Sequence, residues 1–301
     1  MAEDSWTGAY GILHTAYRKF VKSIHSVAIL AVVVTLSASL AAQWPSFPTP
    51  NVPRTADGKP NLLAPAPRAA DGKPDLSGIW GSPGWREIGA GSGVSGTGGA
   101  PGTPAVLPRG PGLFFDIGSG VPGGLPFQPA GLALKKQRMA DNMKDNPDAH
   151  CLPMGNMQLY THPQPRKIIQ TPSIVVILYE GNAGIRQIHT DGRPLPDNDQ
   201  QPWWFGYSTG KWVGDTLVVE TTGFRDGGWL DVNGSPLTDA AKMTERFTRV
   251  NYGNLDIEVT VDDPKAYTRP WTVTIKNEIM LDTELIEFIC LENEKSTEHF
   301  R

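Results

Sequence analysis

Residues 189–193, His-Thr-Asp-Gly-Arg, bring three chemically active side chains within five positions. A His beside an Asp could act as a general base, and the guanidinium of Arg193 could hold a carboxylate through two parallel hydrogen bonds. Asp-Gly is also a common turn sequence, so the interpretation we favour is a β-turn in which Arg193 forms a salt bridge. If the protein is an enzyme, His189 and Asp191 are the candidate catalytic residues of this segment.

Aromatic residues form a second group of candidates. They lie around residues 203–224, where Gly214 and Asp215 separate two runs of alternating apolar and polar residues, a pattern typical of a β-hairpin. Aromatic-lined sites bind small apolar or cyclic ligands, although the same rings would serve equally well to plug a closed barrel end. The candidate ligand-binding residues are Arg193, Trp203, Trp204, Tyr207 and Trp229.

Several charged residues fall inside predicted strands. If any of them faces a barrel interior it must be paired, because an unpaired buried charge is very costly. Such a pair could supply an acid or base with a shifted pKa, and Glu245 is the candidate base. Simple alternation, with all these charges facing water, is the interpretation we favour. The residues concerned are Glu180, Arg186, Glu220, Glu245 and Arg246.

Other catalytic signatures are missing from the sequence. The six His residues are scattered without the spacing of a metal site, so we predict no metal. Residues 206–210, Gly-Tyr-Ser-Thr-Gly, match a serine-nucleophile elbow by letter but precede a strand, which excludes that motif. The Gly-rich segment lacks the Gly-Lys-Ser/Thr ending of a phosphate loop, and we predict no cofactor.

The N-terminus predicts export. Arg18, Lys19 and Lys22 precede an apolar run over residues 27–42, which fits a signal peptide cleaved near Ala42. The alternative is an uncleaved anchor that attaches the protein to the inner membrane through residues 24–42. Either interpretation places the bulk of the chain in the periplasm or outside the cell.

The predicted compartment and the net charge of the chain bear on the state of the cysteines and on the possible partners. An oxidising compartment favours a disulfide between the two cysteines, Cys151 and Cys290, over two separate buried thiols. The formal net charge is −4 and no basic stripe is present, so we predict no nucleic-acid partner.

The chain divides into three regions. Residues 1–42 are the signal peptide or anchor, 43–75 a Pro-rich tether with a repeated Arg-x-x-Asp-Gly-Lys-Pro turn, and 76–301 a β domain. That domain carries a Gly/Pro-rich insert over 81–126 and a helix over 129–145, in which Leu132, Met139 and Met143 lie on one side.

The strand pattern predicts a mainly β fold. About nine strands joined by short turns, without crossover helices, favour an antiparallel up-and-down meander closed as a barrel. A short first strand lies in residues 75–80, and further candidate strands span 166–171, 174–180, 185–190, 207–213, 216–222, 242–252, 255–262, 272–280 and 285–292.

Two resemblances support this fold. Gly78-Ile79-Trp80 before a β meander resembles the Gly-x-Trp opening of lipocalin-like (calycin) barrels. The chain is also similar, over residues 74–293, to a large group of exported bacterial proteins. That resemblance implies one exported domain to which both cysteines belong, and it implies no reaction. Its motifs are PDLSGIW (74–80), DAHCLP (148–153), DGR (191–193), GYSTGKWVGDTLVV (206–219), ERF (245–247), DP (263–264), PW (270–271) and CLEN (290–293).

Three functions are consistent with these patterns. The leading hypothesis is an exported lipocalin-like protein that binds a small, partly apolar ligand in an aromatic barrel mouth. The second is an enzyme on the same barrel, a hydrolase, isomerase or lyase, with His189 or Glu245 as the base. The third is a membrane-anchored structural subunit that docks on a membrane complex through its Gly/Pro-rich arm.

Overall fold

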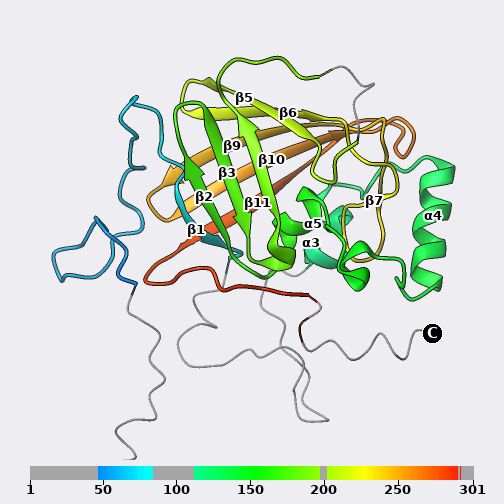
Figure 1. The fold of residues 1–301 in the computed structure, drawn as a ribbon, viewed down its shortest axis with the longest axis horizontal. Helices are drawn as coiled ribbons and strands as arrows, with labels where there is room; N and C mark the ends of the chain where they lie inside the picture. Colours follow the sequence, from blue (N-terminus) through cyan, green and yellow to red (C-terminus); the bar gives the residue numbers. More distant parts are fainter. Residues whose placement is uncertain (1–46, 84–111, 197–201, 291, 293–301) are drawn as a thin grey trace, which may run out of the picture. The chain divides into compact units, whose positions relative to one another are not determined.

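A closed barrel of nine strands forms the body of the protein (Figure 1). The computed structural model describes residues 47–83, 112–196, 202–290 and 292. The predicted signal peptide or anchor lies outside these residues. Within the described ranges, no helix combines the length and apolar character that crossing a membrane requires.

The strands follow one another around the barrel in the order β1-β11-β10-β9-β6-β5-β4-β3-β2. Every neighbouring pair is antiparallel except β4 and β5, which run parallel. The predicted mainly β barrel is therefore confirmed, but the meander is mixed. Residues 190–206 separate the end of β4 from the start of β5, which is enough chain for the return that a parallel pairing requires. The barrel strands are β1 (Gly78–Gly81), β2 (Arg166–Gln170), β3 (Ile174–Tyr179), β4 (Ile185–His189), β5 (Tyr207–Val213), β6 (Thr216–Thr222), β9 (Lys242–Asn251), β10 (Asn254–Asp262) and β11 (Trp271–Met280), and a separate two-stranded sheet contains β7 (Gly228–Trp229) and β8 (Pro236–Leu237).

The predicted last strand, 285–292, is wrong. β1 pairs with both β11 and β2, so the barrel closes without leaving an edge for a further strand. The segment after β11 instead carries Cys290 back to Cys151, and the predicted disulfide between them is confirmed. This bond attaches the C-terminal segment to the turn that precedes α5 (Asn156–Thr161).

The predicted helix is present but shorter, as α4 (Pro129–Ala140). It ends where Asn142 and Met143 adopt left-handed backbone conformations. Leu132 and Met139 are exposed, so the expected apolar face is not the packed one. Gly131 faces the domain instead, because a Cβ there would lie 2.6 Å from the carbonyl oxygen of Ala266.

Short helices accompany the barrel strands in the described chain. They are α3 (Gly112–Phe115) and the 3-10 helices η1 (Ile117–Gly120), η2 (Pro147–His150) and η3 (Gly181–Ala183). The sequence did not predict α5, whose six residues are all buried. Part of the Gly/Pro-rich insert also reaches the core, since Ile117 is fully buried.

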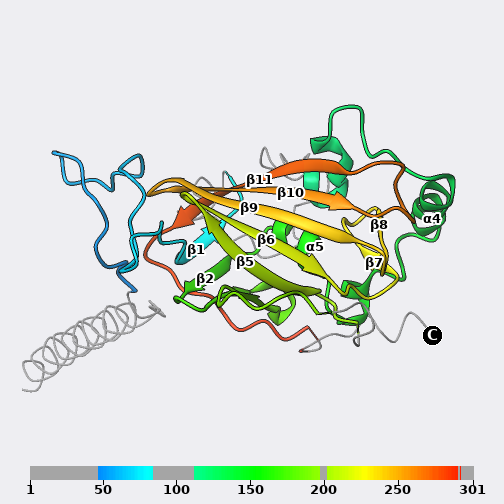
Figure 2. The same cartoon turned by 90° about the horizontal axis from the view of Figure 1, so that it is seen from above.

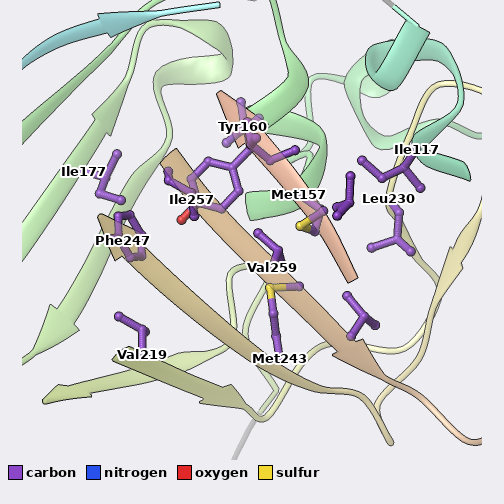
Figure 3. Packing of buried hydrophobic residues seen from close by; sticks show 14 of the residues in the cluster. Ile117, Met157, Tyr160, Ile177, Val219, Leu230, Met243, Phe247, Ile257 and Val259 are labelled. Atoms are coloured by element: carbon purple, nitrogen blue, oxygen red, sulfur yellow. The ribbon is translucent and has the colours of Figure 1, made fainter. Parts of the chain in front are cut away.

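Apolar side chains pack the interior of the barrel (Figure 3). The predicted alternation of β10 is confirmed, since Leu255, Ile257, Val259 and Val261 are all fully buried. Phe247 of β9 meets them from the neighbouring strand. The barrel is therefore held together by a continuous hydrophobic core.

The described part of the tether lies on the barrel, at the end opposite α4 (Figure 2). Both repeats form the same turn, in which Arg54 donates to the carbonyl of Gly58 at 2.7 Å and Arg68 to that of Gly72 at 2.9 Å. Arg68 also binds the carboxylate of Asp215 through two hydrogen bonds of 2.8 and 2.7 Å. The second repeat thereby docks on the β5–β6 turn.

Candidate functional site

Four of the predicted site residues meet on the outer face of the barrel, where β4 and β5 pair. The rings of His189 and Tyr207 stack with centroids 5.3 Å apart, and the ring of Trp203 lies 5.5 Å from that of Tyr207. Arg193 Nη1 donates to the hydroxyl of Tyr207 at 3.3 Å. We call these four residues, His189, Arg193, Trp203 and Tyr207, the aromatic platform.

Strand pairing and one glycine fix the platform rings. His189 pairs with Thr209, which sets the outward side chains of β4 and β5 beside each other. The Trp203 amide donates to the carbonyl of Gly223 at 2.9 Å. Gly223 has φ +70, and a Cβ there would lie 3.1 Å from the Trp203 ring. Glycine is therefore required where the indole crosses the backbone.

Asp191 holds Arg193 in place. The turn has Gly192 at φ +84, and the Asp191 carboxylate accepts from Arg193 Nη2 at 2.6 Å and from Nε at 3.0 Å. These hydrogen bonds lower the pKa of Asp191 to about 2. The predicted β-turn with its salt bridge is confirmed.

This salt bridge argues against a His–Asp catalytic dyad. The carboxylate of Asp191 is engaged by Arg193, and none of the hydrogen bonds between described residues joins it to His189. Burial and the nearby charge of Arg193 lower the pKa of His189, with Asp191 opposing them. The imidazole is thus neutral near pH 7, and no carboxylate of this segment orients it.

The platform lies on the outer face of β4 and β5 and does not line the barrel interior, which differs from the predicted barrel mouth; its His189 and Tyr207 rings are half-buried. Trp203 is 36% exposed, and the Arg193 side chain 45%. Core side chains pack the barrel interior, so a ring-containing ligand cannot enter it. Within the part of the chain that the structure describes, Trp203 and Arg193 are the solvent-exposed members of the platform.

The other two predicted ligand-binding tryptophans lie together elsewhere. Trp204 and Trp229 line a small hollow with Met154, Met157 and Leu237, whose enclosed space is about 10 Å³. That is roughly the room one water needs. The guanidinium of Arg225 covers the Trp204 ring and that of Arg138 the Trp229 ring, at 5.0 and 4.4 Å from the ring centroids. These tryptophans pack under arginines, and the hollow is too small for an organic ligand.

Glu245 lies inside the barrel, away from His189. It forms a buried ion pair with Arg186, whose Nη1 donates to Glu245 Oε1 at 2.8 Å. The hydroxyl of Tyr160, from α5, donates to Glu245 Oε1 at 2.6 Å. Ser208 and Thr221 each accept from Arg186 Nη2 at 3.0 Å. This network of polar residues is enclosed by the core.

The expectation that strand charges face water is therefore wrong for Arg186 and Glu245. It holds for Glu220 and Arg246, which are exposed, while Glu180 is half-buried. The inward charges are tolerated because each partner satisfies the other.

Electrostatics stabilise the charged form of Arg186. Burial alone would lower the pKa of Arg186, but the charge of Glu245 outweighs it and raises that pKa. Burial raises the pKa of Tyr160 well above its usual value. Because Glu245 is completely buried, no substrate can reach its carboxylate in this arrangement.

The described residues contain no group of three or more His, Cys, Asp or Glu side chains placed to hold a metal ion. Comparison with known proteins adds no assignment: no family profile, no curated protein and no solved structure matches the chain.

Proposed function

We propose that this protein is an exported binding protein that holds a small, partly apolar, ring-containing ligand on the aromatic platform. The observation that carries the proposal is the stack of His189, Tyr207 and Trp203, in which Trp203 is exposed and the other two rings are half-buried, bordered by a clamped Arg193. Exposed ring faces attract the flat apolar faces of cyclic ligands. The guanidinium and imidazole add hydrogen-bonding groups at the edge of the stack.

The platform is preorganised for binding. Strand pairing fixes His189 and Tyr207, Gly223 seats the Trp203 indole, and Asp191 restrains Arg193. Side chains that are already ordered lose little entropy when a ligand binds, so more of the contact energy appears as affinity.

The disulfide supports the compartment that the proposal assumes. Disulfides form and persist in oxidising environments, which agrees with a periplasmic or secreted protein. The closed barrel is in keeping with the resemblance to lipocalin-like proteins. The proposal differs from that resemblance in placing the ligand outside the barrel.

Saturation-transfer difference NMR tests the proposal with two probes, phenyl β-D-glucoside and indole. We expect both probes to receive saturation from the native protein and to lose most of it in Trp203→Ala. Phe47→Ala is the matched control, because Phe47 is a similarly exposed aromatic (38%) on the tether. Equal signals in Trp203→Ala and native protein, or none in either, would contradict the proposal.

A further inference from the structure

Arg166 is a buried arginine without a counter-ion among the described residues. It is the first residue of β2, its side chain points into the barrel, and it is 1% exposed. Nη1 donates to Asn277 Oδ1 at 2.9 Å. Nε and Nη2 are sealed from solvent and have no hydrogen-bond partner within the described ranges. Because a guanidinium stays charged in proteins, this arrangement is costly unless something else satisfies it.

The other arginines buried in the barrel strands show what Arg166 lacks. Arg186 is paired with Glu245. Arg249 donates to backbone carbonyls, including that of Tyr252 at 2.7 Å, and covers the ring of Trp80. Among the described residues buried in the barrel strands, three arginines therefore accompany a single carboxylate, that of Glu245, which Arg186 already occupies.

A second orphaned group lies beside Arg166. Tyr179 is its cross-strand partner on β3; the buried Tyr179 hydroxyl interacts with Tyr160 but makes no hydrogen bond of normal geometry to a described residue. The guanidinium of Arg166 and the hydroxyl of Tyr179 can both donate hydrogen bonds. The two side chains lie on the same side of the sheet because the residues are directly opposite each other. The ring of Tyr160 borders the site, 5.9 Å from the guanidinium carbon of Arg166.

Buried side-chain atoms without a hydrogen-bond partner among the described residues also occur at Gln158, His162 and Gln164, just before Arg166 in the sequence. The two Gln atoms are carbonyl oxygens, which accept hydrogen bonds, so only the donors of Arg166 and Tyr179 point to an anion. Clusters of this kind in native proteins are explained by ordered water, an ion or a ligand. Donors from a guanidinium and a phenol specify a negative charge.

We propose that Arg166 and Tyr179 form an internal binding site for a monovalent anion: a halide, or the carboxylate of a small organic acid. Nε and Nη2 of Arg166 and the Tyr179 hydroxyl donate to it. Because all three atoms are sealed, the anion enters during folding or when the barrel opens, and it exchanges slowly. The site is separate from the aromatic platform.

Thermal unfolding after refolding in chosen anions tests this site. We expect the Tm of the native chain to rise by a few degrees as chloride or formate replaces the bulky sulfonate MOPS, at constant ionic strength, from about 1 to about 300 mM, because an anion that binds only the folded state stabilises it. The rise should vanish in Arg166→Met and shrink in Tyr179→Phe. Arg249→Met is the matched control, since it removes a buried guanidinium that donates to carbonyls. It should lower the Tm but keep the rise.

Native mass spectrometry of protein isolated without added salt distinguishes between the two kinds of anion. A bound organic acid that is absent from Arg166→Met, with no response to chloride, supports a carboxylate ligand. A bare protein whose Tm rises with chloride supports a halide. A bare protein without any Tm response overturns the proposal, as does an unchanged rise in Arg166→Met. If Arg166→Met does not fold, the neutral variant Arg166→Gln and Tyr179→Phe decide in the same way.

Discussion

Arg186 and Glu245 bury an ion pair completely inside the barrel, with side chains 1% and 0% exposed. Removing one partner leaves the other charge unpaired in the core. We expect Glu245→Leu to reduce the free energy of unfolding by about 3–5 kcal/mol. The double variant Arg186→Met/Glu245→Leu should recover much of that loss, because it replaces both charges with apolar groups.

Urea denaturation measures both variants. The exposed pair of Arg246 and Glu258 provides the control, since Glu258→Leu should change stability little. If the double variant is no more stable than Glu245→Leu, the other hydrogen bonds of the network contribute more to the free energy of unfolding than the ion pair alone.

His162 gives the fold a pH dependence. Burial, the largest influence, lowers its pKa from 6.5 to about 4 in the folded state. The unfolded chain therefore binds a proton between about pH 6.5 and pH 4 that the folded chain does not. This part of the stability is fully present above pH 6.5 and falls, by up to about 3 kcal/mol, as the pH drops toward 4.

Denaturation at about pH 7.5 and about pH 4.5 checks this slope. His162→Leu should flatten it, whereas His150→Gln should leave it unchanged because His150 is exposed. A slope as steep in His162→Leu as in the native chain would assign the effect to other groups.

Gly131 should resist a substitution that normally strengthens helices. Alanine in a helix interior is usually better than glycine by about 1 kcal/mol. In α4 the new methyl group would lie 2.6 Å from the carbonyl oxygen of Ala266. We expect Gly131→Ala to displace α4 and lower the Tm, while Leu132→Ala on the exposed side has little effect. A higher Tm for Gly131→Ala would mean that α4 does not pack as described.

The disulfide closes a loop across 139 residues, between Cys151 and Cys290. In the chain-entropy description, losing so long a cross-link costs about 2–5 kcal/mol of stability. We expect Cys151→Ser/Cys290→Ser to unfold at lower urea concentration than the oxidised native chain. If the native chain is first reduced, its midpoint should match that of the double variant. Equal midpoints for oxidised and reduced protein would contradict this role of the bond.

The sequence predicted the strands well where one face is apolar and turns are explicit. β5, β6 and β10 follow from alternation and from the Gly214-Asp215 turn. The last strand failed because β1 had already closed the barrel, a long-range pairing that no local pattern encodes. The helix α5 is too short to show a helical period, so its burial and the position of Tyr160 were missed.

The candidate site was predicted in part. His189, Asp191, Arg193 and Tyr207 do lie together, because a turn and a parallel pairing bring them to one face. The inward direction of Glu245 was readable from β9, where Met243, Glu245 and Phe247 alternate with exposed residues. The general rule that charges face water masked that signal. Arg166 gave no such signal, because only the three-dimensional structure shows that its hydrogen bonds are incomplete.

The aromatic platform is the proposed site of ligand binding. Chemical-shift mapping of ¹⁵N-labelled protein during titration with phenyl β-D-glucoside tests it most directly. Binding there predicts saturable shifts of the Trp203 indole N–H and of the backbone amides of His189, Tyr207 and Thr209. The indole N–H signals of the buried Trp80 and Trp229 should stay in place. Saturable shifts confined to the hollow beside Trp204 and Trp229, or no saturable shift at Trp203, would contradict it.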